Sequence, residues 1–168
     1  MTAPAPARLR VDGHCLIVLE RTLQATHPLE GCALLLGEQQ GDTLRLQRIW
    51  PCCNSWFPET ERSHRFQLDP REQLLAQRWA RQRDLQVLGA AHSHPSSAAS
   101  PSPTDLKLCL GPCLMLIHSG MPQSERPWGA WWIADATPDE GSLQGSGTAP
   151  LELILEIALD QGAEDLGE

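Results

Sequence analysis

Apolar residues along the chain follow two spacings, which predicts a domain built from both strands and helices. Alternating or continuous apolar runs of four to nine residues predict strands at 8–11, 29–37, 43–50, 65–68, 86–92, 113–118 and 128–134. Helical spacing behind capping residues predicts helices at about 14–25, from about 70 onward, and at about 103–110. This order suits one α/β domain over residues 8–135, with a mixed β-sheet packed against helices.

Two of the predicted helices have clear starting residues. Asp12 can accept hydrogen bonds from the first turn of the first helix, and Asp69 can do the same for the second. We expect Leu74, Leu75 and Trp79 of the second helix to face inward. Its arginines are expected to face solvent, although four of them in one helical region are also compatible with an anion-binding patch.

The C-terminal part of the chain changes in composition. Residues 136–150 are rich in Gly, Ser, Thr and Pro, which is typical of a flexible connector. Apolar residues then alternate over 151–159. We therefore favour a last strand of the same domain at 151–160, with a helix as the alternative.

The charge balance argues against a nucleic acid as the main partner, because the chain has 13 Lys and Arg but 21 Asp and Glu, which gives a formal net charge of −8. The N-terminus has no apolar segment typical of a signal peptide, and no apolar run is long enough to span a membrane. The expected location is the cytoplasm. Six cysteines fit buried free thiols there. A second zinc site is the less favoured alternative; it would use Cys52, Cys53, Cys109 and Cys113.

Two histidines at the end of the predicted strand at 86–92 give the strongest chemical signal. Side chains alternate along a strand, so His92 and His94 point to the same face. Asp105 follows His94 by eleven residues, after a loop. Two imidazoles and a carboxylate make a three-ligand zinc site with one position open, which is the pattern of a catalytic zinc.

Ser102 and Glu30 each have a structural alternative to a catalytic role. Ser102, followed by Pro103 and Asp105, is a typical helix start, and this capping role is compatible with metal binding. Glu30 opens an apolar strand, where a carboxylate is costly unless it is hydrogen-bonded, near a cation or at the surface. A solvated strand end is its alternative to a functional acid.

The residues His92, His94, Ser102 and Asp105 have the spacing His-x-His-x7-Ser-x2-Asp. This pattern resembles the JAMM motif of the MPN+ zinc metallopeptidases, which also has a glutamate upstream. Residues 27–37 look like the segment that carries this glutamate, so Glu30 is the matching residue. The resemblance covers most of residues 8–135 and is closest to the small bacterial and archaeal branch, which implies a single MPN domain.

The resemblance implies that His92, His94 and Asp105 bind one Zn²⁺, with Glu30 as general base and acid and Ser102 as oxyanion donor. It also implies hydrolysis of a peptide or isopeptide bond after the C-terminal Gly-Gly of a ubiquitin-like or sulfur-carrier protein. Loops at 51–63 and 96–101 are candidate walls for the substrate tail.

Two other functions stay open. One is a non-catalytic MPN interaction scaffold, although such modules usually lose motif residues that this chain keeps. The other is a metallohydrolase that acts on an unrelated small peptide or amide. The sequence does not predict the oligomeric state.

Overall fold

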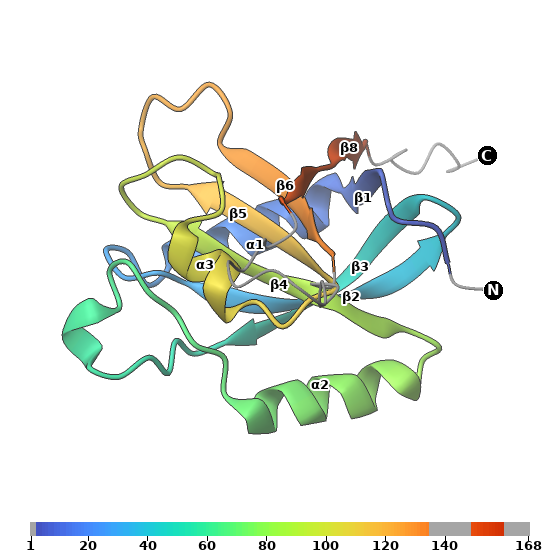
Figure 1. Cartoon of the computed structure of the whole chain (residues 1–168), viewed down its shortest axis with the longest axis horizontal. Coiled ribbons are helices and arrows are strands. Elements are labelled where there is room, and N and C mark those ends of the chain that lie inside the picture. Colours follow the sequence, from blue (N-terminus) through green and yellow to red (C-terminus); the bar gives the residue numbers. More distant parts are fainter. Residues whose placement is uncertain (1–2, 135–148, 160–168) are drawn as a thin grey trace, which may run out of the picture.

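The computed structural model describes residues 3–134 and 149–159, which form a mixed eight-stranded sheet with helices on both faces (Figure 1). The elements are β1 (Arg8–Asp12), α1 (Gly13–Gln24), β2 (Cys32–Gln40), β3 (Thr43–Cys52), α2 (Pro70–Arg81), β4 (Gln86–His94), α3 (Pro103–Leu108), β5 (Cys113–Ser119), β6 (Trp128–Ile133), β7 (Leu151–Glu152) and β8 (Ile154–Ala158). A short 3₁₀ helix spans Glu59–Glu61. The predicted connector at 136–150 lies outside the described residues except for its last two.

The sheet has the order β7-β6-β5-β4-β2-β3-β1-β8, which places β4 in its interior. On one side β4 pairs antiparallel with β2, where Cys32 lies opposite His92. On the other side it pairs parallel with β5, where His92 is the partner of Ile117. Both neighbours bury the strand that carries the two histidines, so its backbone is fixed along its length.

The C-terminal segment joins the two edges of this curved sheet. β7 pairs with β6, and β8 pairs with β1. Leu153 lies between these strands, where its N–H donates to Ala130 O at 2.8 Å and its side chain is 4% exposed. The prediction of one last strand is therefore corrected to two short strands, because the chain changes edges at Leu153.

The first helix covers one face of the sheet (Figure 1). Its N-cap, Asp12, accepts a hydrogen bond from the N–H of His14 at 2.7 Å, as the sequence predicts. The buried residues Leu16, Leu19 and Leu23 pack against alternate residues of the strands. These residues form the larger apolar core.

The second helix covers part of the opposite face, where Trp79 packs as predicted but two alanines take the place of the predicted leucines. Ala76 and Ala80, one turn apart, are buried, and Trp79 packs at their side. Leu74 is 65% exposed and Leu75 is 53% exposed, so the inward orientation predicted for them is wrong. The contact with the sheet is formed by small side chains, which lets the helix lie close to the strands.

Two predicted strand boundaries also change. Residues 65–68 form no strand, although Leu68 still packs beneath α2. The strand predicted at 29–37 begins only at Cys32. Glu30 therefore lies in the loop that leads into β2. Among the described residues, no helix has the length and apolarity needed to cross a bilayer.

Candidate metal centre

The last residues of β4 bring His92 and His94 to one face of the sheet, as their alternate positions predict. It is the face of Cys32, which lies opposite His92, and of Leu34, which packs beneath α2. Both imidazoles are buried, at 0% and 5% exposure.

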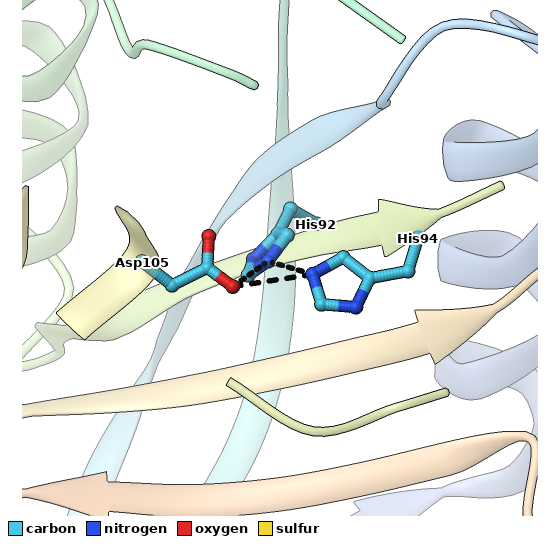
Figure 2. A group of neighbouring side chains, drawn as sticks. All are labelled: His92, His94 and Asp105. Carbon is cyan, nitrogen blue, oxygen red and sulfur yellow. Dashed lines mark hydrogen bonds and ion pairs between the residues drawn. The ribbon is translucent and has the colours of Figure 1, made fainter. Parts of the chain in front are cut away.

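The first turn of α3 supplies a carboxylate to the same place (Figure 2). Ser102 is the N-cap of this helix, and its hydroxyl oxygen accepts from the N–H of Asp105 at 3.1 Å. In return, Asp105 Oδ2 accepts from the N–H of Ser102 at 2.8 Å. This reciprocal capping box fixes the direction of the Asp105 side chain toward the two histidines.

Three potential ligand atoms form a nearly equilateral triangle in this site. His92 Nε2 and His94 Nε2 are 3.0 Å apart, and Asp105 Oδ2 lies 3.2 Å from the first and 3.1 Å from the second. A tetrahedral zinc ion with ordinary nitrogen and oxygen bonds separates its ligand atoms by about 3.3 Å. The donor set and its spacing therefore fit a zinc ion. Within the described residues, no other group of three or more His, Cys, Asp or Glu converges in this way.

The orientation of each imidazole has a separate cause. His94 Nδ1 donates to the carbonyl oxygen of Ala98 at 2.8 Å, which leaves the Nε2 lone pair free for a metal. The ring of His92 stacks on Phe66, with centroids 4.4 Å apart and planes 22° apart. His92 Nδ1 has no hydrogen-bond partner among the described residues.

The electrostatics of the three groups favour a neutral His92, a charged Asp105 and a His94 that protonates more readily than a free imidazole. Complete burial lowers the pKa of His92, because it disfavours the charged imidazolium. Burial also acts to raise the pKa of Asp105, but hydrogen bonds from His92 and His94 outweigh it and hold that pKa well below its usual range. For His94, contacts with Asp105 and the Ala98 carbonyl outweigh burial and raise the pKa.

Glu30 lies beside this centre. Its side chain is 3% exposed, and its Oε2 atom has no hydrogen-bond partner among the described residues. Pairing between β2 and β4 continues one residue beyond Cys32, since the N–H of Ser93 donates to Gly31 O at 3.0 Å. Glu30 thereby comes opposite His94, on the face of the candidate ligands. Burial raises the pKa of Glu30 to about 7, with a smaller contribution from Asp105 that is opposed by His94.

Asn54 is a residue of this region that sequence reasoning missed. Its Nδ2 donates to Glu30 O at 3.1 Å and to Arg65 O at 2.8 Å. Its Oδ1 accepts from the N–H of Trp56 at 3.1 Å and from the N–H of Gln67 at 3.2 Å. All of its amide donors and acceptors are therefore used, and they join the backbone of Glu30 to the segment that holds Phe66 against His92.

Ser93 was also missed, although it stands between the two histidines in the sequence. Its hydroxyl oxygen accepts from the N–H of Gly31 at 2.8 Å, so it fixes the backbone next to Glu30. His118 points away from the centre. Its Nε2 lies 3.4 Å from a carboxylate oxygen of Glu20 on α1, and its ring packs on Trp128.

Comparisons with known proteins agree with the fold. A solution structure of a protein from Desulfitobacterium hafniense matches with a TM-score of 0.70 and 28% identity, covering 92% of this chain and 97% of that one. A protein from Salinibacter ruber, also solved in solution, has a TM-score of 0.60 and 24% identity, covering 92% and 94%. No curated protein matches the sequence.

A family model matches residues 15–134, which include Glu30 and all the residues of the candidate centre. The family is described as prokaryotic homologs of the JAB domain, and the match spans well over half of the chain. The observed mixed sheet with a few helices is the JAB (MPN) fold that the motif implied. This chain belongs to the prokaryotic JAB family, within the wider JAMM/MPN group.

Proposed function

We propose that the chain is a zinc-dependent hydrolase that cleaves a peptide or isopeptide bond after the C-terminal Gly-Gly of a ubiquitin-like or sulfur-carrier protein. The observation that carries the proposal is the buried triangle of His92, His94 and Asp105, beside the unpartnered carboxylate of Glu30. Membership of the JAB family, which includes metalloproteases, supports the reaction class. A cytoplasmic location is part of the same proposal.

When bound, zinc would act as a Lewis acid that polarises the scissile carbonyl and makes water acidic enough to lose a proton near neutral pH. His92 Nε2, His94 Nε2 and Asp105 Oδ2 would hold it. In this proposal, Glu30 transfers the proton and Ser102 stabilises the oxyanion.

Glu30 takes the proton of the attacking water at its carboxylate and passes it to the leaving amine. A general base is most efficient when its pKa lies near the working pH, and burial raises the pKa of Glu30 to about 7. Its Oε2 has no hydrogen-bond partner among the described residues. The carboxylate is therefore free to exchange a proton.

Ser102 stabilises the oxyanion that forms from the attacked carbonyl. Its hydroxyl oxygen accepts a hydrogen bond from the N–H of Asp105. This bond uses a lone pair of the oxygen and not the hydroxyl proton. The O–H remains available to donate. Capping and oxyanion stabilisation can thus coexist in one side chain.

The loop before α2 is a candidate wall for the substrate tail. Phe57 is 84% exposed in this loop, whereas Trp56 is half-buried and its Nε1 donates to Glu61 at 3.0 Å. Trp56 therefore packs within the loop, and Phe57 is the side chain available to a peptide.

The test is cleavage of a sulfur-carrier protein that ends in Gly-Gly-Cys, followed by mass spectrometry. We expect loss of the cysteine, abolished by a zinc chelator and reduced by about 100-fold or more in Glu30→Gln. Glu38→Gln is the matched control, because Glu38 lies on β2 and pairs with Arg45 at 3.5 Å, away from the centre.

The other outcomes separate the alternatives. Zinc binding without cleavage of the carrier would point to another substrate, which a panel of peptides without Gly-Gly would identify. Full activity of Glu30→Gln would contradict the role given to Glu30. Neither zinc nor cleavage would favour an interaction scaffold.

A further inference from the structure

Two cysteines meet where α3 ends and β5 begins. Cys109 is the residue that follows α3, and Cys113 is the first residue of β5. Their Sγ atoms are 2.8 Å apart, which is inside the ordinary contact distance of two sulfur atoms. Both side chains are half-buried and pack beside Ile133, so a small molecule can reach them while their neighbours hold them together.

The other cysteines have different surroundings. Cys32 is buried, and its thiol approaches the carbonyl oxygen of Cys52 at 3.7 Å. The thiol of Cys52 approaches a backbone carbonyl in turn, and Cys53 is exposed. Cys32 and Cys52 lie opposite each other on β2 and β3, but each thiol approaches a backbone carbonyl and not the other sulfur. In the part of the chain that the structure describes, the four-cysteine zinc site considered from the sequence is not formed.

We propose that Cys109 and Cys113 are a redox-active dithiol that reacts with small disulfides and closes to an intramolecular disulfide. In the first step, one cysteine thiolate attacks a sulfur of the small disulfide, forms a mixed disulfide and releases one small thiol. The second cysteine then attacks the protein sulfur of that mixed disulfide and releases the other small thiol. Two protein thiols are oxidised, the small disulfide is reduced to two thiols, and these take up the two cysteine protons.

The position of the pair gives this reaction a structural consequence. The N–H of Cys109 donates to the carbonyl oxygen of Asp105 at 3.0 Å, so Cys109 lies one turn after Asp105, directly past the end of α3. Cys113 begins the strand that pairs with β4. A disulfide would tie the helix that carries Asp105 to the strand beside the two histidines. This inference stands whether or not the proposed hydrolysis is correct.

The experiment treats the full-length reduced protein with oxidised glutathione, blocks the remaining thiols with a maleimide, and measures intact and peptide masses. Trypsin leaves Cys109 and Cys113 on one peptide that begins at Leu108 and contains no other cysteine. We expect this peptide to be lighter by two hydrogen atoms and to carry neither maleimide nor glutathione. The exposed Cys53 should carry glutathione, which shows that the oxidant is active.

Two variants test the exchange mechanism. In Cys109→Ser the remaining Cys113 cannot close a disulfide, so it should keep one glutathione, and Cys113→Ser should keep one at Cys109. Two glutathiones or two maleimides on the wild-type peptide would overturn the proposal. The proposal would also be overturned if the remaining cysteine failed to react with oxidised glutathione in Cys109→Ser and in Cys113→Ser alike. The wild-type result stands even if a serine variant fails to fold.

Discussion

At the scale of single residues, hydrogen bonds orient most groups of the candidate centre. His94 is held by the Ala98 carbonyl, Asp105 by the N–H of Ser102, and the backbone of Glu30 by Asn54. Such outer contacts orient ligands before a metal arrives and so lower the cost of binding it. Asn54 makes the most of these orienting hydrogen bonds, because its side chain contacts four backbone groups.

Replacing Asn54 with Ala should loosen this region. We expect the free energy of unfolding to fall by about 1–3 kcal/mol, because several hydrogen bonds of a half-buried amide are lost. Hydrogen exchange at the N–H groups of Trp56 and Gln67 should accelerate, since both donate to Asn54. Denaturant unfolding and NMR-detected exchange measure the two effects.

Ser55→Ala is the control for that variant. The side chain of Ser55 donates one hydrogen bond, to the carbonyl oxygen of Gln67 at 2.9 Å, and it is exposed. Its loss should change stability by less than about 1 kcal/mol and leave the exchange of Trp56 unchanged. Equal effects of the two variants would refute the special position of Asn54.

The candidate ligands could be predicted from the sequence because each belongs to a regular local pattern. The strand alternation places His92 and His94 together, and the helix start places Asp105. Asn54 could not be predicted in this way. It binds backbone groups 24 residues before it and 11 and 13 residues after it, and those contacts exist only after the chain has folded.

At the scale of elements, the start of α3 has to serve both stability and chemistry. Its capping box uses the hydroxyl of Ser102 as an acceptor and the carboxylate of Asp105 as a second acceptor. The helix has only six residues, so its formation depends strongly on this cap. Substitutions of Ser102 can separate the two functions.

Ser102→Gly should preserve the start of the helix, because Gly is well tolerated at an N-cap, but it removes the hydroxyl donor. We expect stability within about 0.5 kcal/mol of wild type and a rate of hydrolysis lower by about 100- to 1000-fold. Ser102→Ala should lose both, with about 1 kcal/mol less stability. The measurements are thermal unfolding and the carrier-cleavage rate. A fully active Ser102→Gly would limit Ser102 to capping.

Helix faces were harder to predict than helix starts. Asp69 does cap α2, and its oxygen accepts from the N–H of Arg71 at 2.9 Å. The apolar residues Leu74 and Leu75 nevertheless stay exposed, while Ala76 is buried. The prediction for the two leucines failed because of side-chain size. A helix that approaches a sheet closely needs small residues at the contact. The sequence alone does not reveal that distance.

At the scale of the whole molecule, residues 151–158 connect the edges of the sheet. They bring β6 and β1, which are far apart in the strand order, into one structure. The alternation of apolar residues predicted a strand here, but the change of edge at Leu153 depends on the curvature of the entire sheet. Local sequence carries no signal for it.

Leu153→Ala should therefore destabilise the fold, whereas Leu151→Ala should not. Leu153 is 4% exposed and belongs to the main core, while Leu151 is 50% exposed. We expect a loss of about 2–4 kcal/mol for the first and less than about 1 kcal/mol for the second. Denaturant unfolding of the two variants compares them. Equal losses would contradict the role of Leu153 in joining the edges.

The central claim, a zinc centre at the end of β4, is tested most directly by metal analysis of the purified protein. After stripping and reloading, the wild type should bind one zinc ion per chain. Asp105→Asn should bind it more than about 100-fold more weakly, because a charged ligand is lost and not merely an outer contact. Wild-type protein that takes up no zinc, or Asp105→Asn that binds it equally well, would contradict the account.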